Sequence, residues 1–167
     1  SIENLLRGAV DSANAEIYEL SHTNTEWEGM GTTAVVLLVV DNLAHIVHVG
    51  DSRAYIVGAS EIEQLTTDHS IVQAMVTKGE ISPEEARTHP KKNIITRAIG
   101  VEASVKCDIF DFSPEPGSRL LMCSDGLSNM LTDREILYHS SVNSSIEIAA
   151  EDMLKLALER GAPDNVT

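Results

Sequence analysis

The stretch TTAVVLLVVDNLAHIVHVGDSRAYIVG, residues 32–58, decides the fold because it holds three strand-like runs in close succession. The first run, Ala34–Val40, is apolar without interruption, which predicts a strand covered on both faces. Asp41-Asn42 is a two-residue turn signal, so the following run LAHIVHVG is expected to fold back as its partner. Because such short turns join antiparallel strands, this stretch predicts an antiparallel sheet.

A second hairpin is expected further along the chain. The runs RAYIVG and IEQLT flank the turn residues at 58–60, and the alternating run at 104–112 and the apolar run at 119–123 add two more strands. Residues 2–20 and 146–160 carry apolar side chains at helical spacing, and Ser82-Pro83-Glu84-Glu85 is typical of a helix start. Hairpin-linked strands with amphipathic helices outside them predict an α+β layered domain.

Composition excludes several classes of partner. The chain has 167 residues, 26 acids and 12 bases, for a formal net charge of −14. This charge argues against nucleic acid or an anionic membrane surface as a partner, and no apolar run approaches the ~20 residues of a membrane span. Cys107 and Cys123 lie in apolar runs without zinc-ligand spacing, which fits a reducing cytoplasm.

Three aspartates follow the ends of predicted elements. Asp51 comes directly after a strand, Asp125 follows the run at 119–123, and Asp164 follows a helix stop. Asp51 and Asp125 each have a neighbouring glycine, which allows the backbone to approach a ligand or ion closely. Hard divalent cations prefer carboxylate, carbonyl and water oxygens, so three converging carboxylates would form a cation site.

Each of these motifs has an ordinary structural interpretation when it is taken alone. Asp125 could cap a helix that begins at Leu127, Asp51 could be a hairpin residue, and Asp164-Asn165 could form an Asx-turn. Three neighbouring polar residues are likewise more typical of strand or surface positions than of ligands: His45, His48 and Arg53. Single motifs therefore leave the choice between a turn former and a metal ligand open.

The ordered series of motifs is more specific. GMGTTAVV, HVGDSRAY, QLTTDHS, GEISPEEARTHPKKNIITRAIG, LLMCSDGLSNML and GAPDNVT together closely resemble the PPM/PP2C-type metal-dependent protein serine/threonine phosphatases in their compact bacterial form. The resemblance runs over residues 30–167, and the first helix fits it in position. It implies a four-layer α-β-β-α sandwich of two antiparallel sheets with helix pairs outside.

The resemblance also implies an activity. Two Mn²⁺ or Mg²⁺ ions would acidify a bridging water that attacks the phosphorus of phosphoserine or phosphothreonine, without a covalent enzyme intermediate. Phosphoproteins would be the substrates, and by analogy the phosphatase would be cytoplasmic and would oppose a cognate membrane serine/threonine kinase.

Individual positions match the family's metal site. Asp125 and Asp164 match ligands of the second metal, and Asp51 matches the residue that shares a third, weaker metal with Asp125 in bacterial members. Asn93 falls where some members offer a serine to that third metal, and residues 78–93 match the flap near the cleft. Several neighbours match residues that shape the turns or the strand entry: Gly31, Thr32, Thr33, Gly50, Gly126 and Asn165.

The family's N-terminal part has no counterpart in this sequence. It carries a phosphate-gripping Arg, a Glu-Asp motif, a metal-bridging Asp in an Asp-Gly-x-Gly-Gly motif, and a His proposed as general acid. Residues 1–167 are therefore expected to be one partial domain, the C-terminal two-thirds of the family fold, incomplete at both ends. This chain alone is expected to be weakly active or inactive and to dimerise through exposed sheet edges.

Two other functional interpretations stay open. The missing ligands favour a non-catalytic pseudophosphatase or regulatory module that binds proteins, whereas the three retained aspartates disfavour it. A sporulation- or stress-type phosphatase is a weaker alternative, because the full flap and the HVGDSR motif are more typical of the general bacterial branch.

Overall fold

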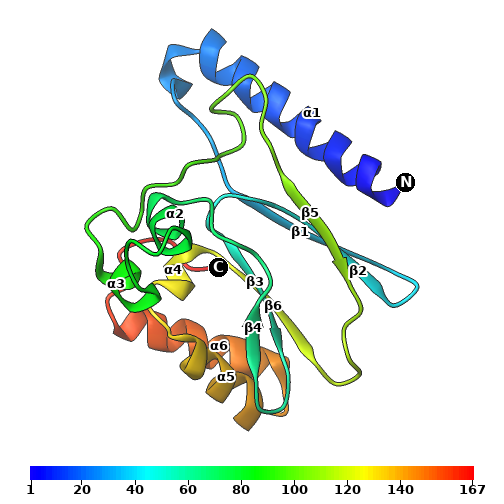
Figure 1. Cartoon of the computed structure of the whole chain (residues 1–167), viewed down its shortest axis with the longest axis vertical. Helices are drawn as coiled ribbons and strands as arrows, with labels where there is room; N and C mark the ends of the chain where they lie inside the picture. The colour runs from blue at the N-terminus through cyan, green and yellow to red at the C-terminus, as the bar shows by residue number, and fades with distance from the viewer. The chain divides into compact units, whose positions relative to one another are not determined.

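The computed structural model describes all 167 residues, which form two compact units. Unit 1 comprises Ser1–Asp51 and Asp68–Ser113, and unit 2 comprises Ser52–Thr67 and Pro114–Thr167. Each unit contains one three-stranded antiparallel sheet and its own helices (Figure 1). The predicted α+β class with two antiparallel sheets is confirmed.

Unit 1 is built on the sheet β1-β2-β5. Its elements in chain order are α1 (Ile2–Thr23), the 3-10 helix η1 (Thr25–Trp27), β1 (Ala34–Val40), β2 (Leu43–Val49), α2 (Ile71–Thr77), α3 (Pro83–Thr88) and β5 (Asp108–Phe112). Asp41 and Asn42 both have positive φ, 50° and 65°, as a two-residue hairpin turn of the primed type requires. The predicted hairpin between the first two strands is therefore confirmed.

The core of unit 1 lies between α1 and one face of its sheet. Leu6 and Val10 of α1 join Val47 and Val49 of β2 in one buried cluster. Removing such side chains from water is the main source of stability for a layer of this kind, at about 25 cal/mol per Å² of apolar surface. The apolar stripe predicted for the first helix therefore packs against this sheet.

One prediction for this sheet is wrong. β1 is not covered on both faces, since Val36 is 44% exposed and Val39 is 54% exposed. The reason is its position, because β1 lies at the edge of the sheet while β2, in the centre, carries the buried residues from Ala44 to Val49. The last strand is also shorter than expected: β5 begins at Asp108, where its pairing with β2 ends at His48.

Unit 2 is built on the sheet β4-β3-β6. Its elements are β3 (Arg53–Val57), β4 (Ile62–Gln64), β6 (Arg119–Cys123), α4 (Asp125–Ser128), α5 (Asp133–Val142) and α6 (Ile146–Glu159). The second predicted hairpin, between β3 and β4, is confirmed. The core joins the sheet to the helices through a buried cluster that includes Tyr55, Leu131, Ile136, Met153 and Ala157.

An ion pair ties the start of α5 to the end of α6. Glu135 accepts a hydrogen bond from the Thr132 backbone N–H at 2.8 Å in a capping box, and Arg160 Nη1 donates to Glu135 Oε2 at 2.9 Å. The Arg160 guanidinium, helped by Thr132, lowers the pKa of Glu135 to about 2. Because the folded pKa lies below the unfolded value, this pair stabilises the fold at pH values above the unfolded pKa. The contribution is lost as the pH falls toward 2.

Glu135→Gln is therefore expected to lower the free energy of unfolding at pH 7 by about 1 kcal/mol, a value discounted for partial exposure. The Gln side chain can still accept from Thr132, so the loss reports the charge. Urea denaturation of both proteins from pH 7 to pH 2 measures it, and the two stabilities are expected to converge in acid. Glu159→Gln is the control, because Glu159 and Lys155 form a 3.9 Å pair between exposed side chains. A difference that persists at pH 2 would contradict the assignment.

Candidate metal-binding site

The turn after β6 is clasped to the C-terminal residues of the chain, within unit 2. Ser124 N–H donates to the Thr167 carbonyl at 3.1 Å, and Thr167 N–H donates to Ser124 Oγ at 3.1 Å. Ser124 Oγ also lies 3.4 Å from the Asn165 carbonyl, to which it donates. These bonds set the segment that carries Asp125 beside the segment that carries Asp164.

Gly126 lies at the closest point of this contact. A Cβ at this position would lie 2.1 Å from the Asn165 carbonyl oxygen and 2.9 Å from its carbon. Both are backbone atoms, so a side chain could fit only if one of the two segments moved. Only glycine allows the two aspartate-bearing segments to approach in this way.

Asp125 itself is the first residue of α4, and the N-cap is Ser124. The alternative that Asp125 caps a helix starting at Leu127 is therefore wrong, because the helical turn begins two residues earlier. Its Oδ2 accepts a hydrogen bond from Asn129 Nδ2 at 3.2 Å, and the residue is half-buried. This contact fixes the direction of the carboxylate.

Asp164 is exposed in the loop after α6. Its Oδ1 accepts from the N–H of the next residue, Asn165, at 2.7 Å. That bond reaches one residue along the chain rather than the two of an Asx-turn. Asp125, at the start of α4, and Asp164, in the loop after α6, thus belong to two clasped segments of unit 2, and both carry the kind of oxygen ligand that a hard divalent cation takes.

Asp51 lies in unit 1, in the bend that follows β2. The bend depends on Gly50, which has φ +109° and whose added Cβ would lie 2.4 Å from Thr33 Cγ2. Both backbone groups of Gly50 are bonded by one residue: its N–H donates to His69 Nδ1 at 3.0 Å, and its carbonyl accepts from His69 N–H at 2.8 Å. The backbone leading into Asp51 is therefore held firmly.

Unit 1 also gathers three side chains that were not predicted as a group. His48, His69 and Asp108 each offer a ligand atom, and these atoms lie within 4.8 Å of one another. His48 and Asp108 are register partners on β2 and β5, and the rings of His48 and His69 stack at 4.7 Å. Sequence reasoning treated His48 as an ordinary strand histidine and missed His69, although both lie in the motifs HVGDSR and TTDHS.

The contacts of this cluster suit a hydrogen-bonded network better than a cation. The Gly50 N–H can only donate, so His69 Nδ1 accepts and the ring proton sits on Nε2, which donates to Asp108 Oδ2 at 2.9 Å. Arg97 Nη1 lies 3.0 Å from His69 Nε2 and donates to Asp108 Oδ1 at 3.1 Å. A metal ion at this point would meet the positive guanidinium at close range.

Charge within the network is balanced around Asp108. Partial burial raises the pKa of its carboxyl, but the hydrogen bonds from His69 and Arg97, together with the positive charge of Arg97, outweigh burial and lower the pKa below its ordinary value. Asp108 is therefore an anion whose partners are already in place. The three side chains are residue types that bind metals, but the positive group that Asp108 contacts in the structure is the Arg97 guanidinium.

The residues predicted to form the flap lie in unit 1 and include α3. Asn93 is exposed in the turn after α3. Immediately beyond it the chain returns to His69: Thr96 N–H donates to the His69 carbonyl at 2.8 Å, and Ile71 N–H donates to the Ile94 carbonyl at 3.0 Å. The residues just after the predicted flap are thus paired with the segment that begins at His69, which holds Gly50.

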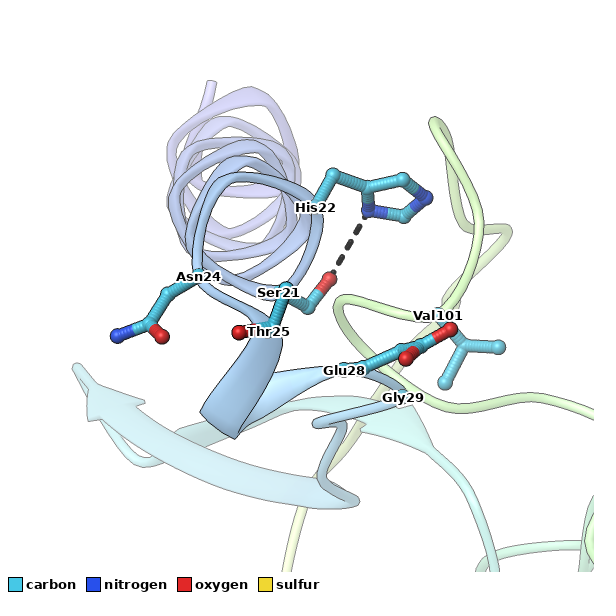
Figure 2. A pocket seen from close by; sticks show the side chains of 7 residues that line it. All are labelled: Ser21, His22, Asn24, Thr25, Glu28, Gly29 and Val101. Atoms are coloured by element: carbon cyan, nitrogen blue, oxygen red, sulfur yellow. Dashed lines mark hydrogen bonds between the residues drawn. The ribbon is translucent and has the colours of Figure 1, made fainter.

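A pocket of about 470 Å³ opens at the end of α1 in unit 1 (Figure 2). Its lining consists of Ser21, His22, Asn24, Thr25, Glu28, Gly29 and Val101. Figure 2 shows the Ser21 hydroxyl bonded to His22 Nδ1, at 3.0 Å. None of the predicted site residues lines this pocket.

Comparison with known proteins places the chain in a family. The family model described as protein phosphatase 2C matches residues 2–74. The serine/threonine phosphatase stp of Listeria monocytogenes is 37% identical over 166 residues, covering 99% of this chain and 66% of the relative. The chain thus spans slightly less than two thirds of that relative's length.

Solved structures agree with the sequence comparison. The serine/threonine phosphatase Stp1 of Staphylococcus aureus is 41% identical with a TM-score of 0.94, covering 98% of this chain and 65% of that one. The catalytic domain of the phosphatase PstP, solved in complex with two manganese ions, is 36% identical with a TM-score of 0.87, over 96% of this chain and 66% of that one. No helix here has both the length and the apolar character needed to cross a membrane. The chain belongs to the bacterial branch of the PP2C-type serine/threonine phosphatase family.

Proposed function

We propose that this chain is the larger part of a phosphatase domain that hydrolyses phosphoserine and phosphothreonine in proteins with the help of divalent metal ions. The observation that carries the proposal is the clasp in unit 2, where three hydrogen bonds set the Asp125 and Asp164 segments together with only a glycine between them. The printed names of the relatives, which are serine/threonine phosphatases, support it.

Asp125 and Asp164 would bind one of the two catalytic Mn²⁺ or Mg²⁺ ions, and Asp51 would help to hold a third, weaker ion together with the side-chain carbonyl of Asn93. Oxygen ligands of this kind suit both metals. Gly50, Gly126 and Asn165 would shape the loops that present the carboxylates. The pair of catalytic cations, when bound, would supply an activated water and would neutralise charge on the phosphoryl oxygens.

The chain's own residues would provide ligands and loop geometry rather than a nucleophile. Residues 78–93 would form the flap beside the substrate, and phosphoproteins modified by a cognate kinase in the cytoplasm would be the substrates. The alternative is a regulatory module without catalysis, which would keep the fold and lack turnover.

A chimaeric domain tests the proposal. In it, these 167 residues replace the matched 166 residues of the Listeria monocytogenes phosphatase. We expect hydrolysis of a phosphothreonine peptide that requires Mn²⁺ and stops with EDTA, and weak or absent hydrolysis by the 167-residue chain alone. A folded chimaera that binds Mn²⁺ without turnover would favour the regulatory alternative.

The exposed edge of β1 gives a second expectation, for the isolated chain. An unpaired strand edge is a template for another strand, and β1 pairs only with β2 and exposes Val36 and Val39. We expect the 167-residue chain to dimerise at micromolar concentration, and we expect Val39→Lys to shift it toward monomer. Light scattering measures the mass. A monomeric wild-type chain would overturn this expectation.

A further inference from the structure

Gly50 is held by hydrogen bonds whose role is separate from that of the predicted metal ligands. A single residue, His69, bonds both the N–H and the carbonyl of Gly50, one through its ring and one through its backbone. Gly50 immediately precedes Asp51, so the backbone that presents the Asp51 carboxylate is set by His69. Gly50 has φ +109°, a conformation that glycine adopts readily and other residues rarely do.

The ring of His69 can accept from Gly50 only in one tautomer. Nδ1 must be unprotonated, which places the ring hydrogen on Nε2, where Asp108 Oδ2 accepts it at 2.9 Å. Asp108 is in turn bonded by Arg97 at 3.1 Å and is paired in register with His48 on β2. The ring is buried, 6% exposed, so water offers little competition for these bonds.

The same residue, His69, joins the segment that follows the predicted flap to this bend. Thr96 N–H donates to the His69 carbonyl, and an isolated bridge pairs Ser70 with Ile95. Arg97, which completes the network at Asp108, is the next residue along this segment. One hydrogen-bonded chain therefore runs from residues 95–97 through His69 to Gly50.

We propose that His69 is a positioning residue for Asp51: it clamps the Gly50 bend through both backbone groups, and the Asp108–Arg97 pair holds its ring in the tautomer that the clamp requires. The proposal rests on the proposed function in so far as Asp51 is taken to bind metal. His69 would orient a metal ligand without binding the metal itself. Loss of His69 is therefore expected to weaken metal binding more than it weakens the fold.

Two substitutions separate the two sides of the ring. In His69→Asn the amide oxygen takes the place of Nδ1 and can accept from Gly50. In His69→Gln the longer amide reaches toward Asp108 and leaves the Gly50 N–H without its acceptor. His45→Gln is the matched control: His45 lies on β2, the strand that leads into Gly50, and its Nδ1 lies 2.7 Å from Asp111 Oδ1 on β5.

In the chimaera, His69→Gln is expected to raise the Mn²⁺ concentration for half-maximal activity about tenfold. It should leave kcat at saturating Mn²⁺ within about threefold of the unsubstituted chimaera. His69→Asn should recover most of the shift, His45→Gln should show none, and Asp51→Asn sets the scale of losing the ligand itself. Equal kcat losses in both His69 variants without a change in Mn²⁺ dependence would mean that His69 is merely structural and would overturn the proposal.

Amide hydrogen exchange of the 167-residue chain, followed by NMR, reads the clamp without any turnover. The Gly50 amide should be protected in the wild-type chain and in His69→Asn and should exchange faster in His69→Gln. Unchanged protection in His69→Gln would overturn the clamp.

The Mn²⁺ titrations separate the positioning role from the proposed function. A shift in the Mn²⁺ requirement of Asp51→Asn without one in His69→Gln overturns the positioning role and leaves the proposed function intact. No shift in Asp51→Asn overturns the ligand role of Asp51 and the positioning role with it, and an inactive chimaera overturns the proposed function, on which the positioning role rests.

Discussion

Replacement of Asp125 by Asn is expected to lower Mn²⁺-dependent hydrolysis of a phosphothreonine peptide by the chimaera at least about 100-fold. Loss of a group that only supports a metal ligand already costs about 10–100-fold, so loss of a ligand charge is expected to cost more. Asn keeps the size of the side chain and can still accept from Asn129, so the loop geometry is retained. The change therefore isolates the negative charge that a divalent cation needs.

Steady-state kinetics over a range of Mn²⁺ concentrations measures this effect. Asp133→Asn is the control in the same unit, since Asp133 is exposed at the start of α5. Its activity is expected to stay within about twofold of the unsubstituted chimaera, as surface changes away from a site are small. Retained activity in Asp125→Asn would refute the ligand role.

Gly126→Ala is expected to lower the free energy of unfolding of the chain by about 1–3 kcal/mol and to weaken Mn²⁺ binding by unit 2. The added methyl would lie 2.1 Å from the Asn165 carbonyl oxygen, and neither backbone can yield without breaking the bonds between Ser124 and Thr167. Stability and metal affinity should therefore fall together.

Urea denaturation and Mn²⁺ titration measure the two losses. Gly58→Ala is the matched control, because its Cβ would meet Glu61 Cγ at 3.5 Å, an ordinary contact, in the same unit. We expect a change of less than about 0.5 kcal/mol there. If Gly126→Ala is as stable as the wild-type chain, the two loops are not locked in the way the structure indicates.

Local patterns predicted the parts of the fold that local physics decides. The Asp41-Asn42 turn, the capping box at Ser82 and the helix of residues 146–159 follow from backbone conformation, caps and periodicity within a few residues. The exposure of β1 did not follow in this way. An apolar run reads the same at a sheet edge as at its centre, and strand order depends on β5, far along the chain.

The candidate site shows the same division. Single aspartates could be noticed in the sequence, but the clasp between the segments that carry Asp125 and Asp164 is a tertiary contact, in which Ser124 hydrogen-bonds to Thr167, 43 residues away. The His69–Asp108 bond joins residues 39 apart and no local pattern reports it. The tautomer of His69 follows from the Gly50 N–H that points at its Nδ1, and only the three-dimensional structure shows this contact.

The strand orders of the two sheets have a consequence for synthesis on the ribosome. The central strands β2 and β3 each pair on one side with a hairpin neighbour and on the other with a strand about 65 residues further along, β5 or β6. At about 5–20 residues per second, each would wait roughly 3–13 s for its second partner. During that interval one edge of β2 and one edge of β3 would have backbone N–H and C=O groups without a strand partner. We therefore expect chaperones that bind extended apolar segments to bind the nascent chain at these two strands.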